Sequence, residues 1–222
     1  MHRTVLIAFA AAILAVPTSP RADERPKYPF KSAVVTYRIS GSIQEGTQTL
    51  TIDDHGRKTR TERDTTLTLM GKKQKESIVE IDDGESLYRI DLVKKTGEKT
   101  QSFSRVAREM VRSMSPAQKK ALEDIGKELA KGHATTGEVK QAGKGKVLGR
   151  ECDVYEAMGM KSWLWNNLPL KKESPSLGNM VQEAVEINLD KPIPPEKFKP
   201  PPGVTITEAT RGGEGPESAV AP

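Results

Sequence analysis

The chain has 222 residues, of which 29% are charged and 5% aromatic, and its formal net charge is +5. Basic and acidic residues alternate along the chain instead of forming separate blocks, which argues against a nucleic-acid-binding surface. The only cysteine, Cys152, excludes an internal disulfide, so the fold has to depend on a packed core.

The N-terminus has the pattern of a secretory signal peptide. Arg3 precedes an apolar run of twelve residues, and Ala22 ends the segment that follows it. A membrane-spanning helix needs roughly 20 apolar residues, so we expect cleavage near Ala22 rather than the alternative, an uncleaved anchor. Loss of 1–22 removes Arg3, Arg21 and no acid, which lowers the net charge from +5 to +3. No second apolar run is long enough to span a bilayer, so we expect no integral membrane protein.

The first part of the mature chain alternates in hydrophobicity with a period of two, which is typical of β-strands. Ala33, Val35, Tyr37 and Ile39 fall on one face of the first predicted strand, 33–39. Further strands are predicted at 47–53, 58–70, 76–81 and 87–93, and the last places Tyr88, Ile90 and Leu92 on one face. Short Asp/Gly turns separate these segments, so they predict an antiparallel meander.

A helical period replaces this pattern between residues 102 and 132. One apolar stripe comprises Phe103, Val106, Ala107, Met110, Val111 and Met114. Ser115, Pro116 and Gln118 predict a capping box at the start of a second helix. Gly132 is expected to end that helix, with His133 as a cation at its C-terminus. Since helices and sheet must bury their apolar sides together, we expect this helical pair to cover the sheet.

The β pattern then returns. We predict a turn at 141–145 and the following segments as strands: 146–157, the segment with Trp163 and Trp165, 168–171, and 181–189 with Val181, Val185, Ile187 and Leu189 alternating. Residues 191–202 are rich in proline and are predicted to be extended, and 208–222 has the composition of a disordered tail. The sequence thus predicts one α+β domain over 23–207.

No motif of the chain indicates catalysis. The HExxH, GxSxG, CxxC and P-loop patterns are absent from the sequence. His55 stands beside Asp53 and Asp54. It is either a metal ligand or general base, or an exposed histidine in a turn. Cys152 is either a buried small hydrophobe or a reactive thiol. We expect a protein that is not an enzyme and has no catalytic residue, metal site or cofactor.

A binding surface is the remaining hypothesis. Trp163 and Trp165 share one side of their strand because they are two residues apart. Together with Tyr37 and Tyr88 they are the candidate contacts for a hydrophobic ligand. The alternative for the two tryptophans is a place in the core beneath the helices.

The order of elements and three segments resemble the outer-membrane lipoprotein carrier (LolA/LolB-like) superfamily of Gram-negative bacteria. The segments are VLGRECDVY (147–155), WLWNNLPLKKE (163–173) and EAVEI (183–187), and the resemblance covers about residues 30–207. It implies a periplasmic protein with an antiparallel, half-open β-barrel-like sheet and a central helical pair over its concave face.

Two functions follow from this resemblance and the aromatic positions. The first is binding of a hydrophobic ligand, such as a lipid or a lipoprotein acyl chain. The second is an interaction module with a filled core, in which the edge strands or residues 191–202 dock an envelope protein.

Overall fold

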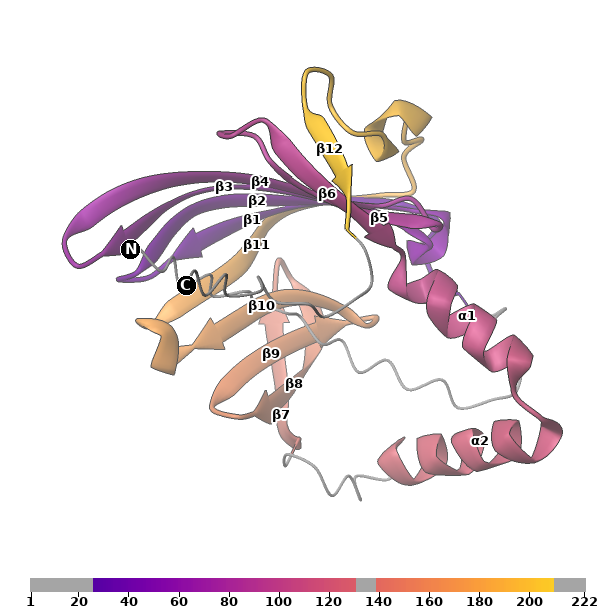
Figure 1. Cartoon of the computed structure of the whole chain (residues 1–222). Coiled ribbons are helices and arrows are strands. Elements are labelled where there is room, and N and C mark those ends of the chain that lie inside the picture. Colours follow the sequence, from indigo (N-terminus) through magenta and orange to yellow (C-terminus); the bar gives the residue numbers. More distant parts are fainter. Residues whose placement is uncertain (1–25, 131–138, 210–222) are drawn as a thin grey trace, which may run out of the picture.

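The computed structural model describes residues 26–130 and 139–209. The predicted signal peptide, the C-terminus of the second helix at Gly132 and His133, and the tail from residue 210 onward lie outside the described residues. Within the described ranges the chain forms one open sheet of twelve strands and two α-helices (Figure 1).

The strands are β1 (Ala33–Ser40), β2 (Gln44–Asp53), β3 (Lys58–Leu69), β4 (Lys72–Asp82), β5 (Ser86–Asp91), β6 (Thr96–Gln101), β7 (Lys140–Val147), β8 (Arg150–Ala157), β9 (Met160–Trp165), β10 (Leu168–Ser174), β11 (Met180–Leu189) and β12 (Thr205–Glu208). The helices are α1 (Phe103–Ser113) and α2 (Pro116–Ala130), and 3-10 turns occupy η1 (Asp54–Gly56), η2 (Pro175–Leu177) and η3 (Pro195–Phe198).

Two meanders make up the sheet, and they meet at its centre. The strand order is β12-β6-β5-β4-β3-β2-β1-β11-β10-β9-β8-β7, in which only the β12–β6 pair is parallel. β1 pairs with β2 on one side and with β11 on the other. The helices connect β6, at the outer end of the first meander, to β7, at the outer end of the second. The open antiparallel sheet with two helices agrees with the half-open architecture that the sequence predicts.

The sheet curls so that β7–β10 turn beneath β1–β4 (Figure 1). The alternation predicted for the first strand is confirmed, because Ala33, Val35, Tyr37 and Ile39 are all buried. They face the concave side, where a first cluster of buried side chains forms. Its members are Tyr28, Phe30, Ala33, Val35, Tyr37, Ile52, Val147, Cys152, Leu168, Leu170 and Ala184.

A second cluster lies on the opposite, outer face of the sheet. In the row of paired residues that starts at Val35, the positions on β3 and β4 are polar: Thr61 and Glu80. The row that starts at Val34 on the other face reaches Ile81 and then Tyr88. The apolar side of the sheet therefore changes from the concave face at β1 to the outer face at β4 and β5.

The proline-rich segment covers this outer face. Phe198 of η3 is buried against Val79, Ile81 and Ile90, and Ile193, Val204 and Ile206 pack around them. Nη1 of Arg60 donates to the carbonyl oxygens of Lys197 (3.1 Å) and Lys199 (3.4 Å), which fixes the segment to β3. Residues 191–202 are thus part of the fold.

The helices do not cover the sheet, contrary to the expectation from the sequence. No side chain of α1 is buried, and Phe103 is 80% exposed. The physical reason is that the sheet buries its apolar surface by other means. Its concave face packs against the opposite end of the sheet and the segment before β1, and its outer face packs against η3. The predicted capping box is confirmed: Gln118 N–H donates to Oγ of Ser115, and Ser115 N–H donates to Oε1 of Gln118.

Three local predictions were wrong. The predicted turn at 141–145 belongs to β7, and the chain turns instead at Leu148–Gly149, both with positive φ. Strand β6 was not predicted, because TGEKTQ has no apolar alternation. Its Gly97 is needed for packing, since a Cβ there would lie 2.8 Å from Ile206 and 2.9 Å from Ile90.

A β-bulge explains the third error. The pairing of β1 with β11 shifts where Thr36 and Tyr37 face Glu186 and Ala184, so Val185 is the extra residue. Val185 is exposed, whereas Ala184 is buried and Ile187 and Leu189 pack on the first cluster. The regular alternation predicted through Val185 is therefore interrupted.

Replacing Phe198 by Ala is expected to destabilise the protein by about 3 kcal/mol, because it empties the centre of the second cluster. The matched change Phe103→Ala, at an exposed helix position, is expected to change stability by less than about 0.5 kcal/mol. Urea denaturation of both variants measures the difference, and equal losses would contradict the packing described for η3.

Gly145→Ala is expected to destabilise the protein and to alter tryptophan fluorescence. A Cβ at position 145 would lie 2.6 Å from Nε1 of Trp163, which crosses β8 to reach β7. We expect a loss of about 1–3 kcal/mol, typical of overpacking. An unchanged melting temperature and emission spectrum would show that Trp163 does not occupy this position.

Candidate functional site

The four candidate ligand contacts do not come together. Tyr37, Trp163 and Trp165 belong to or pack on the first cluster on the concave face. Tyr88 packs on the second cluster, on the outer face, beside the residues that η3 covers. Contact of these residues with a ligand stays a prediction, but one pocket cannot hold all four.

An aromatic stack fills the concave face next to the tryptophan strand. The ring of Trp165 stacks on Phe30 at 5.9 Å between centroids, and Phe30 stacks on Tyr28 at 5.1 Å. The guanidinium carbon of Arg150 lies 4.1 Å from the Trp165 centroid, and Lys27 lies over the Tyr28 ring at the other end. The segment just before β1 therefore occupies the space in which a ligand was expected.

The other two concave aromatics are held by specific partners. Tyr37 is 2% exposed, and its hydroxyl donates to the carbonyl oxygen of Pro169 at 3.0 Å. Burial raises the pKa of Tyr37, with a further contribution from Tyr28. The ammonium nitrogen of Lys171 lies 4.9 Å from the Trp163 centroid. The tryptophans are thus partly buried side chains at the edge of the core, and helices do not cover them.

The surroundings of Cys152 and His55 show that both residues help to hold the fold together. Cys152 is 1% exposed, and burial raises the pKa of its thiol, which disfavours the reactive thiolate. Nδ1 of His55 lies 3.2 Å from the carbonyl oxygen of Tyr28, and the backbone of His55 is bonded to Tyr28 and Lys31. His55 thus holds the segment before β1 in place, and Cys152 packs in the first cluster. In the described part of the chain, no three His, Cys, Asp or Glu side chains are grouped as metal ligands.

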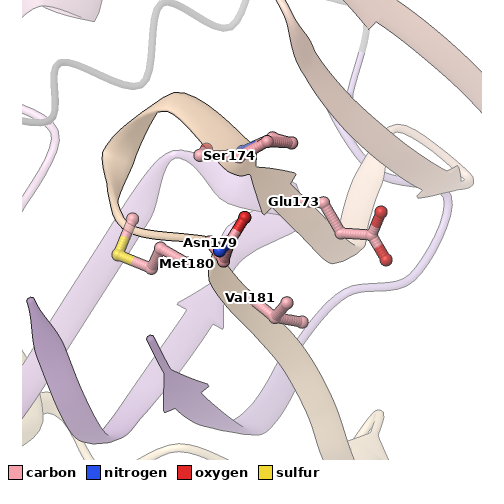
Figure 2. A pocket seen from close by; sticks show the side chains of 6 residues that line it. Glu173, Ser174, Asn179, Met180 and Val181 are labelled. Atoms are coloured by element: carbon pink, nitrogen blue, oxygen red, sulfur yellow. The ribbon is translucent and has the colours of Figure 1, made fainter. Parts of the chain in front are cut away.

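A hollow of about 140 Å³ lies where β10 turns into β11. It is lined by Glu173, Ser174, Pro175, Asn179, Met180 and Val181. Figure 2 shows that the side chains of Glu173 and Met180 point in opposite directions rather than toward a common ligand. The carboxylate of Glu173 is already paired with Lys171 at 2.9 Å. This hollow is small beside the roughly 300 Å³ or more of typical ligand sites.

The helical arm is defined as α1 and α2 (residues 103–130), and α1 contacts the sheet through its polar side. Nη2 of Arg108 donates to the carbonyl oxygen of Gly84 at 2.9 Å, and Arg105 pairs with Glu85 at 3.4 Å. Ser102, at the N-cap of α1, donates through its hydroxyl to Asp82 and through its N–H to the carbonyl oxygen of Glu85. These contacts fix the start of α1 to the β4–β5 hairpin.

Part of the apolar side of the arm is consequently exposed, whereas Val106, Ala107, Val111 and Met114 are half-buried. On a helix, positions 103 and 110 lie nearly opposite positions 105, 108 and 112. Phe103 is 80%, Met110 56% and Leu122 37% exposed. Surface helices of globular proteins normally bury this side. In α1 the orientation is the reverse, because the arginines contact the sheet while Phe103 and Met110 are exposed. Sequence reasoning found the stripe but placed it against the sheet, because the arginine contacts to the hairpin leave no signal in the helical period.

A polar region occupies the concave face beyond the first cluster. Lys172 pairs in register with Gln182, which in turn pairs with Ile39, and Ile39 is buried on the concave side. Arg63 reaches the same face from β3 and donates from Nε to Oε1 of Gln48 at 3.2 Å. Burial lowers the pKa of Lys172, and the charge of Arg63 lowers this pKa further.

None of the described helices has the length and apolar character needed to cross a bilayer. No protein-family model matches the chain, and no curated protein matches it. The family resemblance is therefore not established by sequence.

Similarity to solved structures is low. An uncharacterized conserved protein from Thermus thermophilus aligns over 82% of this chain and 92% of its own, with 9% identity and a TM-score of 0.49. A chain of the Pseudomonas aeruginosa MucA/MucB complex aligns over 82% of this chain and 59% of its own, with 13% identity and a TM-score of 0.41. PNGF-II aligns over 81% of this chain and 32% of its own, with 15% identity and a TM-score of 0.43. These values assign neither a family nor a function to the chain.

Lys172→Met is expected to stabilise the protein at neutral pH, by on the order of 1 kcal/mol, because it removes a poorly solvated charge that faces Arg63. Below its lowered pKa, Lys172 is charged in the folded and unfolded states alike, and the full cost of burying that charge is present. As the pH rises from this lowered pKa toward 10.5, the wild type recovers stability, so the advantage of the variant should shrink. Urea denaturation across this range measures the effect, and an advantage that grows with pH would contradict the assignment.

Proposed function

We propose that the protein is a non-catalytic interaction module of the bacterial envelope that binds a protein partner through the apolar side of its helical arm. Export to the periplasm is part of this proposal and rests on the signal-peptide pattern. The partner is expected to present an apolar groove, into which residues spaced along one side of a helix fit.

The observation that carries the proposal is the reversed orientation of α1. Arg105 and Arg108 bind the β4–β5 hairpin, so the helix is held in place while Phe103 and Met110 face solvent. Large apolar side chains that are held in place and exposed to solvent are typical of a recognition site. Because α1 is already held in place, it would lose little conformational freedom when a partner binds.

The other surfaces considered from the sequence are less suited to docking. Residues 191–202 cover the outer face of the sheet through Phe198 and belong to the core. The edge strand β7 carries Lys140, Lys144 and Lys146, and lysines on an edge oppose further strand pairing. The helical arm therefore remains the best candidate for a docking element.

A second candidate function is binding of a lipid or lipoprotein acyl chain at the same surface. Met110 and Met114 favour it, because methionine side chains are flexible and adapt to apolar ligands of varied shape. The concave face next to the tryptophan strand is less suited to such a chain, since Tyr28, Phe30 and Trp165 fill it with their own stack.

Site-specific photo-crosslinking in cells that produce the protein natively distinguishes these functions. A photoreactive residue is placed at Phe103 or Met110 and, as the matched control, at Met158, an 85% exposed residue in the β8–β9 turn. One discrete protein adduct at both arm positions and none at Met158 is expected. A lipid adduct confined to the arm would favour the second candidate, and equal labelling at all three positions would reject the arm as a docking site.

The double change Phe103→Ser and Met110→Ser is expected to weaken binding of the identified partner about 10-fold to 100-fold, because apolar anchors of an interface typically contribute about 1–3 kcal/mol. Met158→Ser should leave the affinity unchanged. Isothermal titration measures both, and stability should change by less than about 0.5 kcal/mol in either variant because the three side chains are exposed.

A further inference from the structure

We propose that the protein docks on the surface of an anionic phospholipid bilayer through one end of its sheet, which we call the methionine end. The methionine end consists of the β1–β2 turn (41–43), the β3–β4 turn (70–71), the β8–β9 turn (158–159) and the β10–β11 turn (175–179), with the strand residues next to them. It shares no residue with the helical arm, so the proposal does not depend on the proposed function of the arm.

Backbone hydrogen bonds join these turns into one continuous surface. Thr68 N–H, near the end of β3, donates to the carbonyl oxygen of Ile43 in the β1–β2 turn at 2.7 Å. Ser42 N–H, in the same turn, donates to the carbonyl oxygen of Gly178 in the β10–β11 turn at 2.9 Å. β10 then pairs with β9 as far as Lys161, next to the β8–β9 turn. The four turns therefore follow one another along the same end of the sheet.

Two of the turns present methionine to solvent where the backbone geometry favours asparagine. Met70–Gly71 and Met158–Gly159 are two-residue hairpin turns in which both residues have positive φ. Such turns prefer Asn-Gly or Asp-Gly, because most side chains are disfavoured in the left-handed region. Met70 is fully exposed and Met158 is 85% exposed, so neither packs in the core. Neither the turn nor the core therefore accounts for methionine at these positions.

The exposed apolar surface extends to the neighbours of both methionines. Leu69 precedes Met70 and is 46% exposed, and Met160 follows the β8–β9 turn and is 37% exposed. Pro175, in the turn between them along the sheet, is also exposed. Apolar side chains that project from the surface in this way are suited to the boundary between lipid headgroups and acyl chains.

Lysines accompany the apolar tip of the β3–β4 hairpin. The segment LTLMGKKQK (67–75) contains three lysines and no acid, and all three are exposed. Lys73 lies 3.8 Å from the carboxylate of Glu45, whereas neither Lys72 nor Lys75 forms an ion pair within residues 26–130 and 139–209. Lysine places its ammonium group in water and its stem along apolar surface, and anionic lipid attracts such cations. The charge of the hairpin thus complements an anionic bilayer.

The spacing of the two methionine turns fits a bilayer better than a small ligand. Four strands, β2, β1, β11 and β10, lie between the two hairpins. At about 4.8 Å per strand, the turns are at most about 30 Å apart around the curl. The hollow of about 140 Å³ in the β10–β11 turn does not extend to either methionine. A bilayer needs no cavity, because it can contact separate turns at the same time.

The opposite end of the sheet is less suited to anionic lipid. Its β4–β5 turn carries Asp82, Asp83 and Glu85 and no cation, and its β9–β10 turn is Asn166–Asn167, a residue type that such turns favour. The helical arm is fixed to the β4–β5 turn, and Figure 1 shows the β3–β4 turn on the side of the molecule away from α1 and α2. Docking through the methionine end therefore leaves the arm turned away from the bilayer.

Flotation with lipid vesicles tests the proposal. The protein purified after export is expected to float with vesicles made of equal parts of phosphatidylglycerol and phosphatidylcholine. Binding should weaken as the ionic strength rises, and it should be at least about 10-fold weaker with vesicles of phosphatidylcholine alone. Absence of binding to the mixed vesicles would overturn the proposal.

The double change Met70→Asn and Met158→Asn separates docking from folding. We expect binding to the mixed vesicles to weaken about 10-fold or more, whereas the melting temperature should stay the same or rise, because asparagine suits both turns. Leu148→Asn is the matched control, because it makes the same kind of change in the two-residue β7–β8 turn at the opposite end. It should keep the binding of the wild type, and equal binding by all three proteins would contradict docking through the methionine end.

Two further measurements identify the charge and the class of partner. Lys72→Gln with Lys75→Gln is expected to weaken binding to the mixed vesicles about 10-fold or more, and the Phe103→Ser, Met110→Ser variant should bind them like the wild type. A photoreactive residue at position 70 is expected to give a phospholipid adduct in cells. A discrete protein adduct without a lipid adduct, or loss of vesicle binding in the arm variant alone, would reject the bilayer as the partner of this end.

Discussion

The pairing of β1 with β11 is the interaction on which the rest of the molecule depends. It joins two meanders, each of which pairs only neighbouring strands, into one sheet. The bulge at Val185 lies in this pair and increases the local bend. The curl brings β7–β10 beneath β1, so that the first cluster can close, and it places the side chains of β3 and β10 on one concave surface.

A sheet that covers its own apolar surface changes the role of its helices. The first cluster is closed by Tyr28 and Phe30, and the second by Phe198, so neither needs α1. Helix α1 can then be held by polar contacts to the β4–β5 hairpin, with Phe103 and Met110 exposed to solvent. Helical period alone identifies such a side and cannot tell whether the protein or a partner buries it, because both arrangements need the same spacing.

Sequence reasoning succeeded where one face of an element is buried. The first strand shows this, since Val35 and Tyr37 face the core in the predicted register. It failed where packing is set by distant residues: β6 is a strand through its pairing with β5 and β12, with Gly97 leaving room for Ile206, and Leu148 adopts a left-handed turn that its residue type does not suggest. The effect of the Arg63 charge on the pKa of Lys172 was missed for the same reason, because 109 positions separate the two residues in the chain.

The cover of the outer face has a consequence for the order in which the protein can fold. The chain is made from its N-terminus, so β4 and β5 exist long before Phe198 is available to cover Val79, Ile81 and Ile90. Until then the growing first meander has an apolar outer surface, and β1 has an unpaired edge, because β11 also comes late. Contacts between such distant residues slow folding. The nascent chain therefore passes through a prolonged stage in which a holding chaperone would limit its aggregation.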